Sequence, residues 1–316
     1  MPCKCPPSDA PLGVNEDLRQ AMLDLNRART LPDRLRAAAR MNPARAFRPE
    51  IPRNAEPRTG MSMGEHAAIT AREWNIDRTA QDELALASHR RLAAAYERGF
   101  FDDLMTPYLG LRRDQNLRAD TSLEKLASLR PVFGATGPHA ASATMTAGNS
   151  SALSDGASVV LLATEEWARQ RRLPVLAWFT EAETAAVDYV HGGEGLLMAP
   201  VYAVPRLLAR AGVGLGDFDF YEIHEAFASQ VLASLKAWED PDFAKARLGL
   251  EAPPGAIERD RLNVVGSSLA AGHPFAATGG RIVATLAKLL AEKGSGRGLI
   301  SICAAGGQGV TAILER

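Results

Sequence analysis

The alternation of predicted strands and helices across residues 131–316 is the feature that most limits how this chain can fold. Short apolar runs predict strands at residues 159–163, 175–179, 218–223, 298–303 and 310–314. Segments between and after them predict helices at residues 165–171, 202–211, 225–235 and 281–293. Because the connections are short, the pattern favours an α/β layered fold with a largely buried sheet.

The first 130 residues carry a different pattern. A helix is predicted to begin there with Asn15 as its N-cap. A basic run with several prolines follows at residues 27–58, and it predicts mostly loop. Residues 59–130 are predicted to be mainly helical, with one helix capped by Asp77 and closed by Gly99.

Composition and charge exclude several classes of function. The formal net charge of −1 gives no electrostatic reason to expect nucleic acid or an anionic membrane as a partner. No run of 18 apolar residues exists, so no membrane span is expected. The three cysteines, Cys3, Cys5 and Cys303, are too few for a disulfide framework and suit a reducing cytoplasm. Cys3 and Cys5 have no histidine near them, so no metal site is expected.

A first polar cluster lies at residues 221–227, where a predicted strand runs into a predicted helix. Ligands gather at the carboxyl ends of strands in open α/β sheets, so His224 could hold a water or polarise a carbonyl there. The alternative makes His224 a helix cap and Glu225 a first-turn charge. The local sequence alone favours that alternative.

A second cluster surrounds His273 with small residues at positions 266–280. Small residues let a backbone approach a ligand closely, and Pro274 fixes the turn after the histidine. A histidine displayed in this way suits a general base, because its pKa lies near neutrality. A close helix–sheet contact with an incidental histidine explains the pattern equally well.

A third cluster places Cys303 at the end of an apolar strand and before a glycine-rich turn. Turn amides of this kind can point at an oxyanion. A lone cysteine is more often a small core residue. Reactivity would require a lowered pKa, which a nearby His273 could provide.

Together these motifs resemble the thiolase family. The resemblance is closest to the branch that holds the β-subunits of the fatty-acid oxidation complex and of mitochondrial trifunctional protein. Residues 224–227 resemble its HEAF motif, residues 272–275 its GHPF motif, and residues 303–307 its C-terminal cysteine and glycine turn. Further matching segments are residues 62–64, 81–83, 146–151 and 155–157.

The resemblance implies a thiolase-like layered α/β fold of two similar halves, with a loop domain that receives coenzyme A. Residues 1–195 would be a remnant of the N-terminal domain with that loop domain, and residues 196–316 the C-terminal domain. In the family the nucleophilic cysteine lies upstream of the region matched by residues 8–11. The first half of the N-terminal domain is therefore expected to be missing from this chain.

The resemblance also implies an activity: thiolysis of a 3-ketoacyl-CoA, or the reverse condensation, in fatty-acid β-oxidation. His273 would activate the nucleophile, Cys303 would be the acid and base of the second step, and His224 would position an oxyanion-hole water. The backbone amides of Ala305 and Gly306 would face the acyl-enzyme oxygen. The side chains of Met63 and Phe275 would lie along the substrate.

Coenzyme A would be a substrate, with no permanently bound cofactor and no metal. The partners implied are acyl-CoA and CoA, further copies of the chain in a homo-oligomer, and a β-oxidation α-subunit. Without the nucleophile, the chain alone is expected to show negligible thiolysis. The alternative is a non-catalytic thiolase-like subunit that binds acyl-CoA or contributes only oligomer surface.

Overall fold

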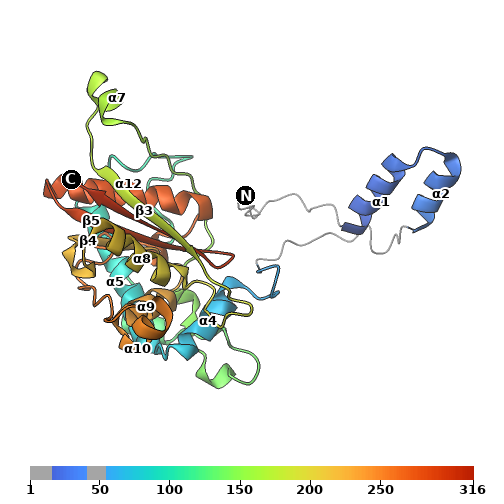
Figure 1. The fold of residues 1–316 in the computed structure, drawn as a ribbon, viewed down its shortest axis with the longest axis horizontal. Coiled ribbons are helices and arrows are strands. Elements are labelled where there is room, and N and C mark those ends of the chain that lie inside the picture. Colours follow the sequence, from blue (N-terminus) through green and yellow to red (C-terminus); the bar gives the residue numbers. More distant parts are fainter. Residues whose placement is uncertain (1–15, 41–54) are drawn as a thin grey trace. The chain divides into compact units, whose positions relative to one another are not determined.

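The computed structural model describes residues 16–40 and 55–316, and the chain divides into two compact units at residues 54 and 55 (Figure 1). The first unit contains helices α1 (Glu16–Arg27) and α2 (Leu31–Arg40). The expected loop over residues 27–58 is therefore wrong for residues 31–40. Sequence reasoning counted prolines as breakers, but a proline is tolerated in the first turn of a helix.

The start of α2 shows the local reason. Thr30 Oγ1 accepts a hydrogen bond from the Asp33 amide at 3.3 Å, and Pro32 lies in the first turn, where its missing N–H is not needed. The predicted N-cap Asn15 and the other prolines of residues 41–54 lie outside the described residues, as do Cys3 and Cys5.

The second unit begins with helices α4 (Met63–Glu73), α5 (Arg78–Glu97) and α6 (Leu123–Ala127). The predicted cap of α5 is confirmed, since Asp77 Oδ1 accepts from the Ala80 amide at 2.9 Å. Its predicted end is confirmed as well, since Gly99 adopts the left-handed conformation with φ of +74°.

A four-stranded sheet forms the centre of this unit, in the order β3 (Trp178–Ala186), β6 (Gln308–Glu315), β5 (Arg297–Ala304) and β4 (Phe220–Ile223). β4 runs parallel to β5, whereas β6 is antiparallel to both β5 and β3. The remaining elements are β1 (Pro131–Phe133) paired with β2 (Met145–Thr146), η1 (Ala140–Ser142), η2 (Ala147–Asn149), α7 (Glu165–Gln170), η3 (Leu215–Asp217), α10 (Pro241–Phe243), η4 (Ala244–Leu248) and α11 (Ser268–Ala271).

Helices cover both faces of the sheet. α8 (Ala199–Ala211) packs on β3 and β6, and α12 (Phe275–Lys293) packs on β4 and β5 (Figure 1). Alternate residues of β5 divide between the two sides, because neighbouring side chains of a strand point in opposite directions. Leu299 and Cys303 join a core cluster with α8 and α9 (Ala228–Glu239), and Ile300 joins a second cluster with α12.

Two strand predictions need correction. Residues 159–163 form no strand, and Val159 is 92% exposed. The prediction treated an apolar run as buried, but no described strand pairs with it. The strand predicted at residues 175–179 begins only at Trp178, and β3 is a partly exposed edge strand, whereas β5 is mostly buried. The sheet is thus buried at β5 and open at β3.

Segments that carry the family resemblance meet in space. Asn149 Nδ2 donates to Asp82 Oδ1 at 3.0 Å, and Asp82 also pairs with Arg78 Nε at 2.7 Å. This polar network fixes the loop before residues 150–158 against α5.

In the described parts of the chain, no helix is long and apolar enough to cross a membrane. The domain division at residues 195 and 196 stays a prediction.

Candidate active site

Two histidines from separate motifs lie side by side. His224 directly follows β4, where its backbone amide donates to the Ser301 carbonyl at 2.9 Å. His273 directly precedes Pro274, the N-cap of α12. Their ring centroids are 4.2 Å apart, and His224 is only 1% exposed. The interpretation of His224 as a helix cap is wrong, because α9 begins later, after its N-cap Phe227.

The backbone around His273 is tightly fixed. Gly272 has a φ of +94°, and a Cβ at this position would lie 2.2 Å from Ser154 Oγ. The amide of His273 donates to the Ala152 carbonyl at 3.1 Å, and Nδ1 lies 2.7 Å from Thr278 Oγ1. Only a glycine permits this turn, so the small residues around His273 hold the ring against His224.

Both imidazoles are neutral at physiological pH. Burial and, to a smaller extent, the charge of Arg281 together lower the pKa of His273 to about 4. Burial, then the neighbouring His273 and Arg281, hold the pKa of His224 well below its usual value. A neutral imidazole has one N–H donor and one acceptor, so the pair can give and take protons within one site.

Ser268 and Arg281 complete the polar network, and sequence reasoning missed both. Arg281 Nη2 donates to Ser268 Oγ at 2.8 Å, and Ser268 Oγ lies 2.8 Å from His224 Nδ1. Arg281 as a whole residue is partly exposed, but its Nε is buried without a partner among the described residues. The sequence did contain a signal for Arg281. It lies beside Thr278 and Ile282, which α12 buries, and a charged residue next to a buried helix face is unusual.

Glu222 lies under this network as a buried acid. Both carboxylate oxygens are buried without a partner among the described residues. Burial raises the pKa of Glu222 to about 8, although the charge of Arg281 opposes the rise. Glu225 is buried nearby, but its oxygens accept hydrogen bonds from Ser88, Asn263 and the Leu269 amide.

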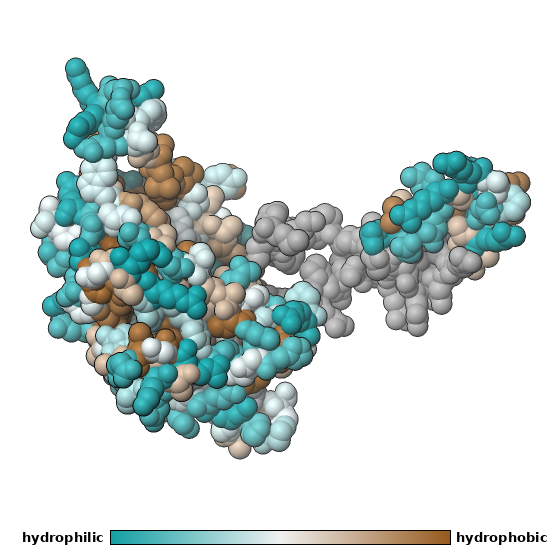
Figure 2. All heavy atoms as spheres, in the orientation of Figure 1, coloured by the Kyte–Doolittle hydropathy of each residue, from teal (hydrophilic) through white to brown (hydrophobic). Residues whose placement is uncertain are grey.

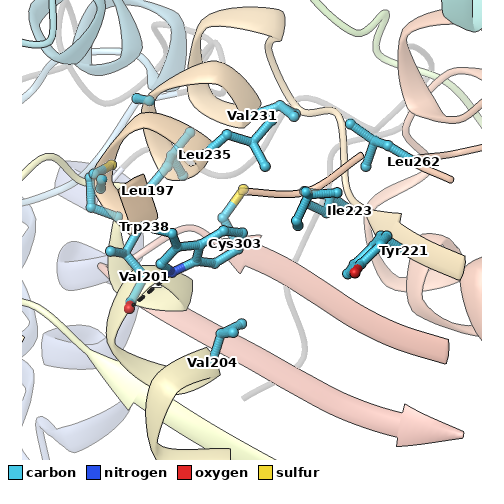
Figure 3. Close-up of a cluster of buried hydrophobic side chains, with 14 of the residues drawn as sticks. Leu197, Val201, Val204, Tyr221, Ile223, Val231, Leu235, Trp238, Leu262 and Cys303 are labelled. Atoms are coloured by element: carbon cyan, nitrogen blue, oxygen red, sulfur yellow. Dashed lines mark hydrogen bonds between the residues drawn. The ribbon is translucent and has the colours of Figure 1, made fainter. Parts of the chain in front are cut away.

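Cys303 lies in a different environment from the histidines. Its side chain belongs to the core cluster that contains Val231 and Trp238 (Figure 3). Within the described residues no hydrogen bond or ion pair joins Cys303 to either histidine. Burial raises the pKa of the Cys303 thiol to about 12. The expected lowering of this pKa by His273 is wrong, because His273 is neutral and the thiol is desolvated.

The glycine turn after Cys303 already binds a carboxylate of the chain itself. The amide of Gly306 donates to Glu56 Oε1 at 2.8 Å, and Tyr189 donates its hydroxyl to Glu56 Oε2 at 2.8 Å. Ala305 is exposed, whereas Glu56 is buried. Sequence reasoning missed Glu56, because nothing in the sequence relates it to a turn so far along the chain.

The two predicted substrate residues lie in separate places. The ring of Phe275 makes an edge contact with His273, with centroids 5.0 Å apart. Met63 is partly buried and packs against the core cluster that holds Cys303. The structure thus brings His224, His273 and Phe275 together, and it places Met63 against the large core cluster of which Cys303 is one member.

A cavity of about 360 Å³ is lined by residues that neighbour the histidine site, although neither His224 nor His273 lines it. Ala152, whose carbonyl accepts from the His273 amide, lines it, and so does Leu269, the neighbour of Ser268. The basic side chains of Arg118 and Lys125 line it as well. Such a cavity can take an elongated ligand with anionic groups. No group of three or more acidic, histidine or cysteine side chains among the described residues could hold a metal ion.

Comparisons with family models and with curated proteins point to the same family. Family models described as the N-terminal and C-terminal domains of thiolase match residues 29–166 and 173–316. A 3-ketoacyl-CoA thiolase of Alteromonas mediterranea is 41% identical over 314 residues, which cover 98% of this chain and 70% of that protein. A 3-ketoacyl-CoA thiolase of Pectobacterium atrosepticum is 40% identical, with 96% of this chain and 69% of that protein covered.

A solved structure agrees with these relatives. The crystal structure of the Bacillus anthracis acetyl-CoA acetyltransferase matches with a TM-score of 0.68 and 33% identity. The match covers 83% of this chain and 61% of that chain, so this chain spans less than two thirds of the solved protein.

The sheet with helices on both faces and a polar site at its strand ends defines a layered α/β protein with an enzyme-like site. The chain belongs to the thiolase family, since both family models and the relatives at about 40% identity agree. By family it is an enzyme, and its fold is the layered α/β fold of thiolases.

Proposed function

We propose that this protein is a thiolase-type acyltransferase for cleavage of a 3-ketoacyl-CoA with CoA, or for the reverse condensation, and that the chain alone binds these compounds with negligible turnover. The observation that carries the proposal is the contact between His224 and His273, with ring centroids 4.2 Å apart. Two neutral imidazoles, the buried His224 and the partly buried His273, provide one site for proton transfer and for a carbonyl oxygen. The names of the relatives support the choice of substrate class.

In the proposed reaction a thiolate attacks the 3-keto carbon, and the bond between C2 and C3 then breaks. The shortened acyl chain forms a thioester on the nucleophile, and the enolate of acetyl-CoA, which leaves, takes a proton at C2. Cys303 would give that proton, because burial keeps its thiol protonated. The resulting Cys303 thiolate would take the thiol proton of CoA, whose sulfur then attacks the acyl thioester.

The first acyl transfer also needs a nucleophilic thiolate. Cys303 is the one cysteine among the described residues, and its raised pKa suits a proton donor better than a nucleophile. We therefore expect negligible thiolysis by the 316-residue chain alone. The same observation favours a second candidate function, in which this chain binds acyl-CoA without turnover.

The cavity lined by Ala152 and Leu269 is the proposed site for CoA. Arg118 and Lys125 would face the phosphates, and the apolar side chain of Leu269 would contact the thiol-bearing arm. Lys125 already pairs with Asp120 at 2.6 Å, so Arg118 is the freer cation of the two. Replacing Arg118 by Gln should weaken CoA binding about fivefold, which corresponds to about 1 kcal/mol. Calorimetric titration measures this, and unchanged affinity would argue against this location.

The remaining functional expectations also stand as proposals. A homo-oligomer is supported by exposed apolar side chains beside α7, where Figure 2 shows hydrophobic residues gathered. These side chains are Val159, Leu161, Leu162, Leu173 and Leu176. A role in fatty-acid β-oxidation, a place in the trifunctional-protein branch, an α-subunit partner and a cytoplasmic location rest on the family resemblance.

The proposed activity is tested with acetoacetyl-CoA and a longer 3-ketoacyl-CoA in the presence of CoA. The purified chain should bind both compounds without loss of the 3-ketoacyl absorbance and without an acyl adduct by intact mass. Turnover with an adduct on Cys303 would overturn our assignment of that cysteine as a proton donor. Absence of binding to either compound would contradict both candidate functions.

A further inference from the structure

We propose that Ser268 and Arg281 are positioning residues that fix the proton of His224 on Nε2. His224 is then a permanent hydrogen-bond donor toward the acyl carbonyl oxygen, or toward a water bound to it. The identity of that acceptor rests on the proposed function, whereas the position of the proton follows from the hydrogen bonds of the chain itself.

The argument begins with the direction of two hydrogen bonds. A guanidinium has only donors, so Ser268 Oγ must accept the 2.8 Å hydrogen bond from Arg281 Nη2. The hydroxyl of Ser268 has a single proton. The acceptor within its reach is His224 Nδ1 at 2.8 Å, and Ser268 Oγ has no other hydrogen-bond partner among the described residues. Ser268 therefore donates to Nδ1, which leaves the ring proton on Nε2.

The tautomer with the His224 proton on Nδ1 leaves more polar groups without a hydrogen-bond partner. If Nδ1 carried the proton, Ser268 would accept from both Arg281 and His224, and its own proton would have no acceptor. His224 Nε2, which is buried without a partner among the described residues, would be left as an acceptor without a donor. Two buried polar groups would then be unpaired instead of one, and each unpaired group destabilises the folded state.

The remaining unpaired group is the functional one. In the proposed tautomer only the Nε2 proton of this network lacks a partner among the described residues, and the cost of its burial is relieved when a ligand oxygen accepts it. His224 is fully buried and rigidly held, so it needs no reorganisation when that oxygen arrives.

His273 is held differently, which separates the roles of the two rings. Its Nδ1 contacts Thr278 Oγ1 at 2.7 Å, and no cation of the described residues donates to that hydroxyl. Thr278 can therefore donate or accept, and His273 is free to present either a proton or a lone pair at Nε2. A fixed donor beside a ring that can change its tautomer suits one carbonyl-binding group and one base.

The test is the protonation state of each ring nitrogen in the full 316-residue chain. Histidine is labelled with ¹⁵N, and two-bond ¹H–¹⁵N correlation spectra distinguish protonated from bare nitrogens. Six histidines are present, and a His224→Gln variant identifies the signal of interest by its loss. We expect a bare Nδ1 and a protonated Nε2 at neutral pH. A proton on Nδ1 of His224 would overturn the proposal.

Two hydroxyl deletions provide matched variants. Ser268→Ala should convert His224 to a mixture of tautomers, whereas Thr278→Ala should alter only His273. An unchanged His224 spectrum in folded Ser268→Ala would refute the positioning role of Ser268. If that variant fails to fold, the wild-type spectrum still decides the tautomer.

Acetoacetyl-CoA binding is measured on the same sample and reports separately on the proposed function. Binding should shift the His224 Nε2 resonance. If acetoacetyl-CoA binds and this resonance does not shift, the ligand carbonyl does not accept the Nε2 proton. If the chain binds acetoacetyl-CoA but His224 carries its proton on Nδ1, only this inference is refuted. If His224 carries its proton on Nε2 but the chain binds no acetoacetyl-CoA, only the proposed function is refuted.

Discussion

Glu222 should make the stability of this protein fall as pH rises through neutrality. The pKa of Glu222 rises from its ordinary value of 4.5 to about 8 on burial. Its stabilising contribution is therefore complete below the unfolded-state pKa and is lost as pH rises through about 8. The change of about 3.5 pKa units corresponds to at most about 5 kcal/mol, at about 1.4 kcal/mol per unit.

Glu222→Gln removes this titration and leaves the others in place. The free energy of unfolding is measured by urea denaturation of both proteins between pH 4.5 and 9. The wild type should lose up to about 5 kcal/mol relative to the variant over that range. The histidines titrate in both proteins, so they cancel in the difference.

An exposed control shows that the effect belongs to the buried acid. Glu292→Gln removes a carboxylate that is 42% exposed and pairs with Arg98 on the surface. Its difference curve should stay within about 0.5 kcal/mol at every pH. A flat curve for Glu222→Gln as well would refute the reasoning, because it would mean that Glu222 titrates normally in the folded protein.

Three further results are expected. Iodoacetamide should modify Cys303 far more slowly in the native protein than in urea, and equal rates by peptide mass spectrometry would contradict its burial and raised pKa. Glu56→Ala should cost about 1–3 kcal/mol in urea unfolding, because it leaves the Gly306 amide and the Tyr189 hydroxyl unpaired; a neutral result would mean that solvent replaces the carboxylate. Asp77→Ala should cost about 1 kcal/mol in the same assay, and Asp77→Asn, which keeps an acceptor, should cost less.

The correct sequence predictions concern features that neighbouring residues decide. Asp77 bonds an amide three positions away, and Gly99 and Gly212 supply left-handed residues just after their helices. The strands near residues 218–223, 298–303 and 310–314 and the helices between them also formed, with ends shifted by a few residues. Capping, apolar periodicity and glycine conformation act over a few residues, so they can be read from the sequence.

The errors concern segments whose state depends on what covers them. The apolar run at residues 159–163 has the composition of a strand, yet no described strand pairs with it. A lowered pKa for Cys303 was also expected, but the alternation of β5 turns its side chain toward the apolar core of α8 and α9. Its pKa rises for the same reason, because burial without a charged partner disfavours the thiolate.

The sequence by itself therefore determined the fold class and the family, and its motifs singled out His224 and His273 as candidates, because these follow from local patterns and short motifs. Only the tertiary structure decided which groups meet. The contact between the two rings, the Arg281–Ser268–His224 chain and the carboxylate of Glu56 on the Gly306 amide join residues that are distant in sequence. Hydrogen-bond direction and desolvation act through space, so the protonation states of the site exist only in the packed molecule.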